Sequence, residues 1–183
     1  REALVLGRLR HPGIVDVIDY GHLENGWPFL ILEFVEGGDL EALLNRSGPL
    51  SLQAGLDVLL QLARVLEYAH AQGVVHRDLK PGNILLRSGD HRLVKVIDFG
   101  LAKLMSAEML TRLTTDGQIM GSPHYMAPEQ AMGLPDISGA ADIYALAGIA
   151  YVVMSGRPVF DSDSPLGLVF AQARHQPERL AQR

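Results

Sequence analysis

The stretch of sequence that decides the fold is His76-Arg77-Asp78-Leu79-Lys80-Pro81-Gly82-Asn83, which places an acid, a lysine and an amide in one short run. Two further motifs follow it along the chain. The triplet Asp98-Phe99-Gly100 comes after a short apolar run, and Ala127-Pro128-Glu129 comes after a longer polar segment. Any one of these motifs is a weak signal by itself. All three in this order are very hard to obtain by chance, so together they indicate one site.

These residue types suit phosphoryl transfer. That reaction needs little covalent help, but it needs an aligned hydroxyl, magnesium bridging the phosphates and cancellation of charge. Asp78 can accept or orient the proton of an attacking hydroxyl, and Asn83 and Asp98 offer the oxygen ligands that Mg²⁺ prefers. Lys80 can lie along the transferring group and offset its negative charge. The alternative is an exposed polar loop without chemistry.

The three motifs resemble the catalytic-loop, magnesium-loop and activation-segment-end motifs of the eukaryotic-like serine/threonine protein kinases. The resemblance covers essentially the whole chain and looks bacterial in style. It implies an α+β, protein-kinase-like fold, with residues 1–35 as the remainder of the small lobe and the hinge and residues 36–183 as the large lobe. It also implies ATP and Mg²⁺ as cofactors and proteins with serine or threonine acceptors as substrates.

The same resemblance assigns roles in the catalytic loop. Lysine at the position of Lys80 goes with serine/threonine rather than tyrosine kinases. His76 is expected to be structural and to pack against Phe99, rather than to act as a base. Asp142 matches the aspartate that holds the catalytic-loop backbone. The remaining histidines have no metal-ligand spacing, so we expect no zinc site.

Five residues match the family's nucleotide site. Leu32 would be the gatekeeper, and backbone groups of Glu33 and Val35 would pair with adenine. Asp39 matches the acid that bonds the ribose, and Leu85 should lie under the adenine ring. For the two leucines alone, core packing would be the default interpretation.

Four further residues match positions that support the catalytic site in this family. Glu2 resembles the C-helix glutamate, which pairs with a lysine that grips the phosphates. Leu6 and Val17 would extend the stack formed by His76 and Phe99. Glu129 should form an ion pair with an arginine far downstream.

A regulatory segment is also expected. Arg77 next to the catalytic aspartate resembles kinases controlled by activation-loop phosphorylation, since a cluster of positive charge can hold a phosphate. Thr114 and Thr115 are the candidate sites, although they could equally be solvated loop threonines. Ser122 stands where the family usually has a threonine that docks near the acceptor, and it keeps the hydroxyl.

Periodicity and breakers predict a mostly helical domain with a few strands at its start. The expected strands are 14–20, 28–35, 84–86 and 93–97, and the expected helices end at Leu9, begin at Asp39, and run over 51–73 and 138–155. The apolar face of the longest helix is expected at Leu52, Leu56, Leu59, Leu60, Ala63 and Leu66. The last helix is apolar nearly all round and should be buried.

Composition limits the other function classes. The 183 residues carry a net charge of -5 and no cysteine, which argues against nucleic-acid binding and against disulfide or thiolate metal sites. No signal peptide is visible, and the most apolar stretch, residues 143–154, is too short to span a bilayer. We expect no membrane contact in this segment and a cytoplasmic location. A membrane anchor elsewhere in the parent protein is left open, and so is dimerisation.

The glycine-rich loop and the ATP-binding lysine of the family have no counterpart in the sequence. We therefore expect a fragment cut at both ends, which is inactive or nearly so in isolation. A pseudokinase or scaffold module is the main alternative, and a small-molecule kinase is a third. Asp78, Asn83 and Asp98 are all present, which argues against a pseudokinase. The Ala127-Pro128-Glu129 segment argues against a small-molecule kinase.

Overall fold

The computed structural model describes residues 9–87, 93–99, 123–162 and 164–180. Its strands are β1 (Val17–His22), β2 (Pro28–Leu32), β3 (Gly37–Asp39), β4 (Ile84–Arg87) and β5 (Val94–Val96). Its α-helices are α2 (Leu40–Ser47), α3 (Leu52–Ala71), α5 (Pro128–Ala131), α6 (Ala140–Ser155) and α7 (Pro165–Arg174). Two short 3₁₀ helices, η1 (Pro81–Asn83) and η3 (Pro123–Tyr125), complete the described elements. Mixed α+β architecture, as predicted, is confirmed.

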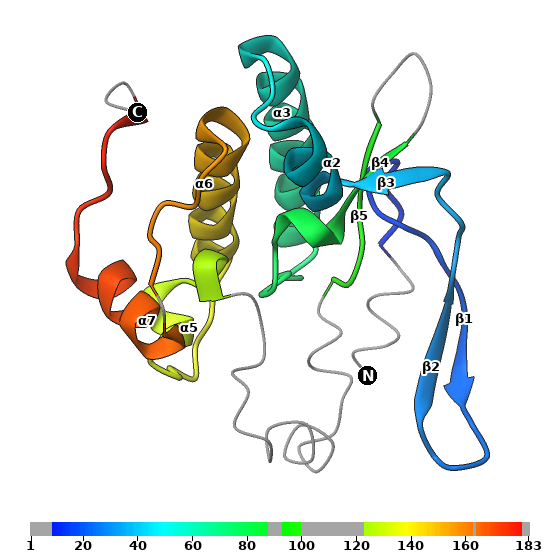
Figure 1. Ribbon diagram of the computed structural model, residues 1–183. Helices are drawn as coiled ribbons and strands as arrows, with labels where there is room; N and C mark the ends of the chain where they lie inside the picture. The colour runs from blue at the N-terminus through cyan, green and yellow to red at the C-terminus, as the bar shows by residue number, and fades with distance from the viewer. Residues whose placement is uncertain (1–8, 88–92, 100–122, 163, 181–183) are drawn as a thin grey trace.

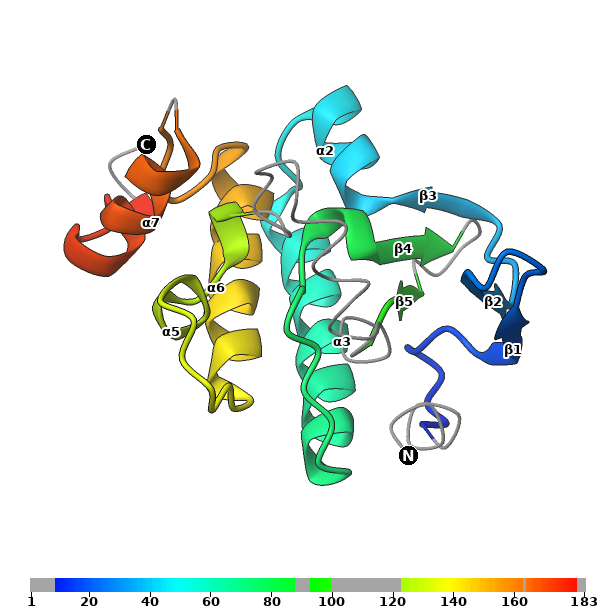
Figure 2. The same cartoon turned by 90° about the horizontal axis from the view of Figure 1, so that it is seen from below.

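The elements separate into a β part and a helical part. Helices α3 and α6 lie side by side, with the small sheet of β3, β4 and β5 at one side of α3 (Figure 1). The hairpin β1–β2 extends beyond that sheet, and α5 and α7 lie beyond α6 (Figure 2). No helix in the described ranges is long and apolar enough to cross a membrane.

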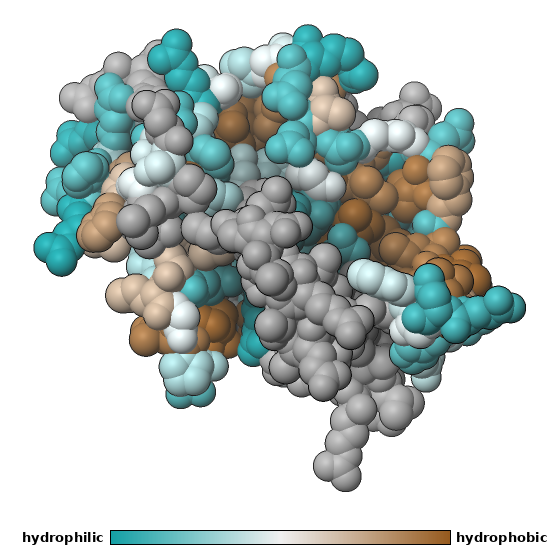
Figure 3. All heavy atoms as spheres, turned by 60° about the horizontal axis from the view of Figure 1, so that its bottom comes forward, coloured by the Kyte–Doolittle hydropathy of each residue, from teal (hydrophilic) through white to brown (hydrophobic). Residues whose placement is uncertain are grey.

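The hairpin β1–β2 is antiparallel and turns at Gly26, whose φ of 84° suits glycine. The predicted strand over 14–20 begins only at Val17, because Ile14 pairs with Val96 in the other sheet instead. Val15 N–H donates to Val96 O at 3.0 Å, which ties the start of the hairpin to β5. Apolar side chains remain exposed on the hairpin, and apolar surface gathers on that side of the molecule in Figure 3.

In the three-stranded sheet, β4 lies between β3 and β5, with antiparallel pairing on both sides. The register places Asp39, Leu85 and Lys95 in one row across the sheet. Side chains alternate between faces along a strand, and the buried positions of β4 and β5 are those on the other face, Ile84, Leu86, Val94 and Val96. One face therefore packs on the core, and the other carries the row of Asp39.

Helix α3 begins at the predicted cap, where Ser51 Oγ accepts from Ala54 N at 3.3 Å. Its predicted apolar face is only partly right: Leu66 is buried and Leu59 packs partly buried against the core, but the other predicted positions are exposed. The buried residues are Gly55, Val58, Leu62, Val65, Leu66 and Ala69, whereas Leu52, Leu56, Leu60 and Ala63 are exposed. The physical reason is the close approach of α6: a Cβ at Gly55 would lie 2.8 Å from Met154 Cε. Gly55 therefore marks the contact, and Leu52, Leu56 and Leu60 lie on the exposed side of the helix.

Helix α6 contributes its buried side to the core. Ile149 and Val153 pack there together with Val58, Leu62 and Leu66 of α3. The expected burial on all sides is met only in part, because Ala140, Ile143 and Ala147 are exposed and several other residues are half-buried. Gly156 ends α6 with a φ of 73°, and its N–H donates to Val152 O at 2.8 Å.

Candidate active site

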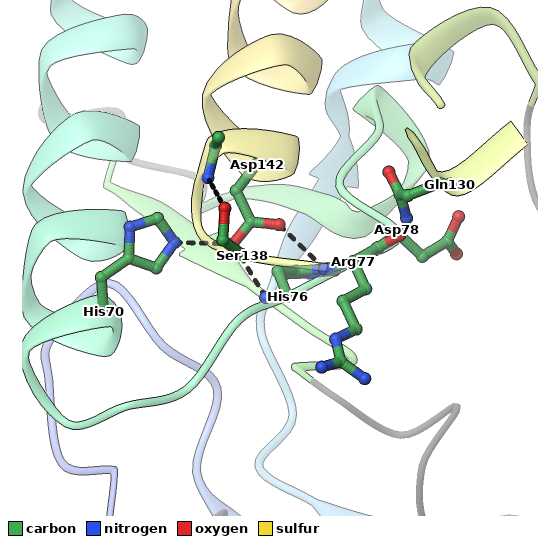
Figure 4. A network of polar contacts seen from close by, with 8 residues as sticks. His70, His76, Arg77, Asp78, Gln130, Ser138 and Asp142 are labelled. Atoms are coloured by element: carbon green, nitrogen blue, oxygen red, sulfur yellow. Dashed lines mark hydrogen bonds and ion pairs between the residues drawn. The ribbon is translucent and has the colours of Figure 1, made fainter. Parts of the chain in front are cut away.

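The loop with the first motif is fixed by one buried carboxylate. Asp142, in the first turn of α6, accepts a hydrogen bond from His76 N through Oδ2 and one from Arg77 N through Oδ1, each at 2.8 Å (Figure 4). His70 Nε2 of α3 lies 2.8 Å from the same Oδ2. Three elements thus meet at Asp142, and the predicted contact with the loop backbone is present.

His76 is buried and packs against Phe99, as expected. Its ring centroid lies 4.7 Å from that of Phe99. Nε2 lies 2.9 Å from Ile97 O, which can only accept, so Nε2 carries the proton. Nδ1 is then free to accept from Asp78 N at 3.3 Å. Burial lowers the pKa of His76, outweighing the opposing influence of Asp142, so the ring is neutral at pH 7.

Asp78 lies among the polar groups of its own loop. Its Oδ2 accepts from Lys80 Nζ at 2.8 Å and from Asn83 Nδ2 at 3.4 Å. Asn83 Nδ2 also donates to Asp78 O at 2.8 Å. Pro81 begins η1, where its missing N–H costs nothing, and this turn brings Asn83 back to Asp78. The three predicted side chains are therefore in direct contact.

Asp98 joins this cluster from the end of β5. Ile97 N donates to Asn83 O at 3.0 Å, which sets Asp98 beside the catalytic-type loop. Asp98 has a φ of 64°, a conformation that few non-glycine residues adopt. Burial raises the pKa of its carboxyl; His76 and Lys80 oppose this rise, and the negative charge of Asp78 adds to it. The carboxyl of Asp98 is partly buried near the negative charge of Asp78, and both effects disfavour its charged form. Such perturbed acids are typical of functional sites.

Arg77 also has a positive φ, of 70°. Its N–H is held by Asp142, and its carbonyl oxygen accepts from Gln130 Nε2 at 2.6 Å. Gln130 was not among the predicted site residues. The sequence signal for it is its position three residues after Ala127, where a glutamine side chain can reach back to the helix N-cap.

The hinge candidates lie where β2 ends. Glu33 N donates to Asp16 O at 3.0 Å, so its N–H is already used within the protein. Its carboxylate accepts from Asp16 N at 3.0 Å and contacts Lys95 Nζ. Desolvation alone would raise the pKa of Glu33, but the hydrogen bonds from Lys95 and Asp16 N–H outweigh it and lower the pKa.

Leu32 faces an apolar cavity, whereas Asp39 caps a helix. Leu32 lines a small apolar cavity together with Val17, Val96, Asp98 and Phe99. This places Val17 on the same cavity as Phe99, in line with the expected stack. Asp39 caps α2, where its Oδ1 accepts from Ala42 N at 2.7 Å, and it pairs across the sheet with Leu85. One oxygen of Asp39 is thus used by the fold itself.

Comparison with known proteins identifies this arrangement. A family model described as "Protein kinase domain" matches residues 1–181. The chain belongs to the protein kinase family. It is 42% identical to serine/threonine-protein kinase PknA of Mycobacterium tuberculosis, over 98% of this chain and 41% of that protein. It is 39% identical to serine/threonine-protein kinase pkn3 of Myxococcus xanthus, over 97% of this chain and 33% of that protein. A probable serine/threonine-protein kinase PknB of Lactococcus lactis is 37% identical, over 92% and 26% of the two chains.

The chain spans less than half the length of these bacterial relatives. Several residues predicted for this kinase domain lie outside the described ranges. They are Glu2, Leu6, Thr114, Thr115 and Ser122. Their roles stay predictions. The described structure brings together Asp78, Lys80 and Asn83, with Asp98 beside them. It places Leu32 and Glu33 at the end of β2, and Asp39 opposite Leu85 in the three-stranded sheet.

The donor set of this kinase domain fits Mg²⁺. Within the described ranges, no group of three or more His, Cys, Asp or Glu side chains is placed to hold a metal ion. Two oxygen donors are offered instead, the carboxylate of Asp98 and the amide oxygen of Asn83, whose nitrogen is engaged by Asp78. Mg²⁺ is usually bound by one or two such groups together with phosphates and water, rather than by an all-protein cage.

Proposed function

We propose that this kinase domain is part of an active serine/threonine protein kinase, which transfers the γ-phosphate of ATP to hydroxyl groups of proteins. The observation that carries the proposal is the cluster at Asp78, whose carboxylate lies 2.8 Å from Lys80 Nζ on a loop held by Asp142. The names of the relatives, serine/threonine-protein kinases, support the same reaction. Because ATP is the proposed co-substrate, we propose that the domain acts in the cytoplasm.

In this proposal Asp78 is the base. Its carboxylate orients the acceptor hydroxyl and takes its proton as the new P–O bond forms and the bond to ADP breaks. Lys80, which neutralises Asp78 in the described structure, turns its charge to the transferring phosphoryl group. Asn83 Nδ2 keeps the backbone of Asp78 in place by bonding its carbonyl.

The proposed cofactor sites adjoin this cluster. Asp98 and the amide oxygen of Asn83 would hold Mg²⁺. When bound, the ion would supply positive charge that offsets the negative charge developing during phosphoryl transfer. The raised pKa of Asp98 supports this role, since a carboxylate held against burial and a like charge gains from a nearby cation.

Adenine is proposed to bind at the end of β2. The carbonyl of Glu33 and the backbone of Val35 would bond its edge, with Leu32 at the back and Leu85 under the ring. Asp39 would bond the ribose with the oxygen that does not cap α2. The position of Glu33 directly after β2 and the half-buried position of Leu85 in β4 support this placement.

The remaining roles rest on the family alone. Glu2 is proposed to pair with a phosphate-gripping lysine, and Ser122 to dock the acceptor segment. Thr114 and Thr115 are proposed phosphorylation sites, with Arg77 as the positive charge that receives the phosphate. Residues 1–35 and 36–183 are proposed to belong to the small and large lobes. In support, the hairpin β1–β2 and the sheet β3–β5 are separate sheets.

Phosphotransfer by the full-length gene product tests the proposal. With radiolabelled MgATP, label should appear on serine or threonine of a protein substrate, and Asp78→Asn should reduce the rate about 10²- to 10⁴-fold. Asp136→Asn, at an exposed position, is the matched control and should leave the rate unchanged. Binding of MgATP without any transfer by the wild type would favour a scaffold, and label found only on tyrosine would contradict the acceptor class.

A further inference from the structure

We propose that Gln130 is a positioning residue for the catalytic base, a role that rests on the proposed function of Asp78. Gln130 lies in α5 and Asp78 lies in the loop before η1, 52 positions earlier in the sequence. Its side chain does not contact the reacting groups. It acts through the peptide bond that joins Arg77 to Asp78.

The first observation is the strained backbone of Arg77. A φ of 70° puts its Cβ close to the following carbonyl, so a non-glycine residue stays there only when the surroundings hold it. Both backbone groups of Arg77 are held by side chains from other elements. Asp142 of α6 accepts from its N–H at 2.8 Å, and Gln130 of α5 donates to its carbonyl at 2.6 Å.

The second observation is that the amide of Gln130 can adopt only one orientation. Its Oε1 accepts from Ala127 N at 3.1 Å, and its Nε2 donates to Arg77 O. A backbone N–H can only donate and a carbonyl oxygen can only accept, so turning the amide over would lose both bonds. The side chain is therefore locked between the N-terminus of α5 and the loop.

The held carbonyl lies in the peptide plane that leads directly into Asp78. Because that plane is rigid, fixing Arg77 O also fixes the direction of Asp78 N and Cα. The other end of the same plane is held by His76, whose Nδ1 accepts from Asp78 N at 3.3 Å. Figure 4 shows Gln130 reaching the chain next to Asp78. Gln130 and His76 thus hold the base by its backbone, leaving its carboxylate free for Lys80, Asn83 and substrate.

A role as a helix cap alone would need only Oε1. Gln130→Glu separates the two contacts, because a carboxylate still accepts from Ala127 N but cannot donate to Arg77 O and repels it instead. Capping and folding should survive this change, while the peptide plane before Asp78 loses its support. Gln176→Glu is the matched control, since it makes the same change at an exposed residue after α7.

Steady-state kinetics of the full-length gene product give the first test. Gln130→Glu should lower kcat by about tenfold or more, since small misplacement of a reacting group is costly. KM for MgATP should stay within about twofold, because the nucleotide contacts are untouched. A kcat of Gln130→Glu within twofold of wild type, or a change in Tm with no change in kcat, overturns the proposal.

Amide hydrogen exchange provides a second test that needs no turnover. In this chain, Gln130→Glu should speed exchange at residues 77–79 about tenfold or more, with α3 unchanged, and the control variant should match wild type. Unchanged exchange at 77–79 overturns the proposal. If the wild type transfers no phosphate, the proposed function fails, yet this measurement still decides whether Gln130 holds the loop.

Discussion

Lys95 Nζ contacts the carboxylate of Glu33 across a separation of 62 residues, joining β5 to the residue that follows β2. The same ammonium lies 3.4 Å from Ile14 O. The side chain of Lys95 is largely buried and that of Glu33 is about one-quarter exposed, at 28%. The pair therefore links the proposed adenine-binding segment to the strand that leads into Asp98.

Lys95→Met tests what this link contributes to stability. Methionine keeps much of the apolar stem but leaves the Glu33 carboxylate without its counter-charge, so the free energy of unfolding should fall by about 1–2 kcal/mol. Urea unfolding at pH 7 measures it. When Lys95→Met is added to Glu33→Gln, it should lower the free energy of unfolding by less than it does in the wild type, because no unpaired charge remains. Equal losses that simply add would show that the two side chains do not interact.

The Glu33 interaction also predicts a pH dependence. Folding lowers the pKa of Glu33 below its ordinary value of 4.5, so the folded state binds the proton less readily than the unfolded state. Its stabilising effect is complete above pH 4.5 and is lost as the pH falls through the lower, folded-state pKa. The difference in unfolding free energy between wild type and Glu33→Gln should therefore shrink from pH 7 to pH 3. A difference that stays constant or grows would contradict the assigned direction.

The sequence predicted the catalytic loop well because its contacts are local. Asp78, Lys80 and Asn83 lie within one turn-forming run, so their spacing nearly determines their contact. The predicted strands at 84–86 and 93–97 were also close to β4 and β5, since each is a short apolar run in the sequence. His76 against Phe99 followed from family resemblance rather than from any pattern.

Long-range geometry was beyond the sequence. The partner of Lys95 depends on where residues 14–16 join β5, which no periodicity encodes. The proposed role of Gln130 depends on the left-handed backbone of Arg77, and no sequence pattern predicts that conformation. The core face of α3 was predicted correctly only in part, because leucines at helical spacing also line its exposed side, whereas the contact with α6 is made where Gly55 leaves room.

A different glycine shows how closely the segment before β1 packs on the helical part. A Cβ at Gly13 would lie 2.5 Å from Val65 Cγ2 and 3.3 Å from Val94 O. Val65 is buried and branched at Cβ, so it has little freedom to move aside. Gly13→Ala should lower the free energy of unfolding by about 1–3 kcal/mol. Gly38→Ala is the control, because nothing lies within 4 Å of its added Cβ. Equal stability of the two variants in thermal unfolding would show that the segment moves to make room.

Asp98 offers a prediction that separates stability from cation binding. Burial raises its pKa above the ordinary 3.8, with Asp78 adding to the rise, so the charged form is disfavoured by folding. The stability linked to this group is complete below pH 3.8 and is lost as the pH rises through the folded-state pKa. At pH 7 without metal, Asp98→Asn should therefore be as stable as wild type or more stable, by up to about 1 kcal/mol.

With magnesium and ADP present, the wild type should become more stable than Asp98→Asn. The wild type should gain Tm from the ligands by linkage, while Asp98→Asn should gain little because the proposed site has lost its carboxylate. Asp136→Asn, which changes an exposed acid, should respond like wild type. An equal ligand-induced shift in wild type and Asp98→Asn would remove Asp98 from the proposed metal site. A metal-free Asp98→Asn that is clearly less stable than wild type would contradict the direction of its pKa shift.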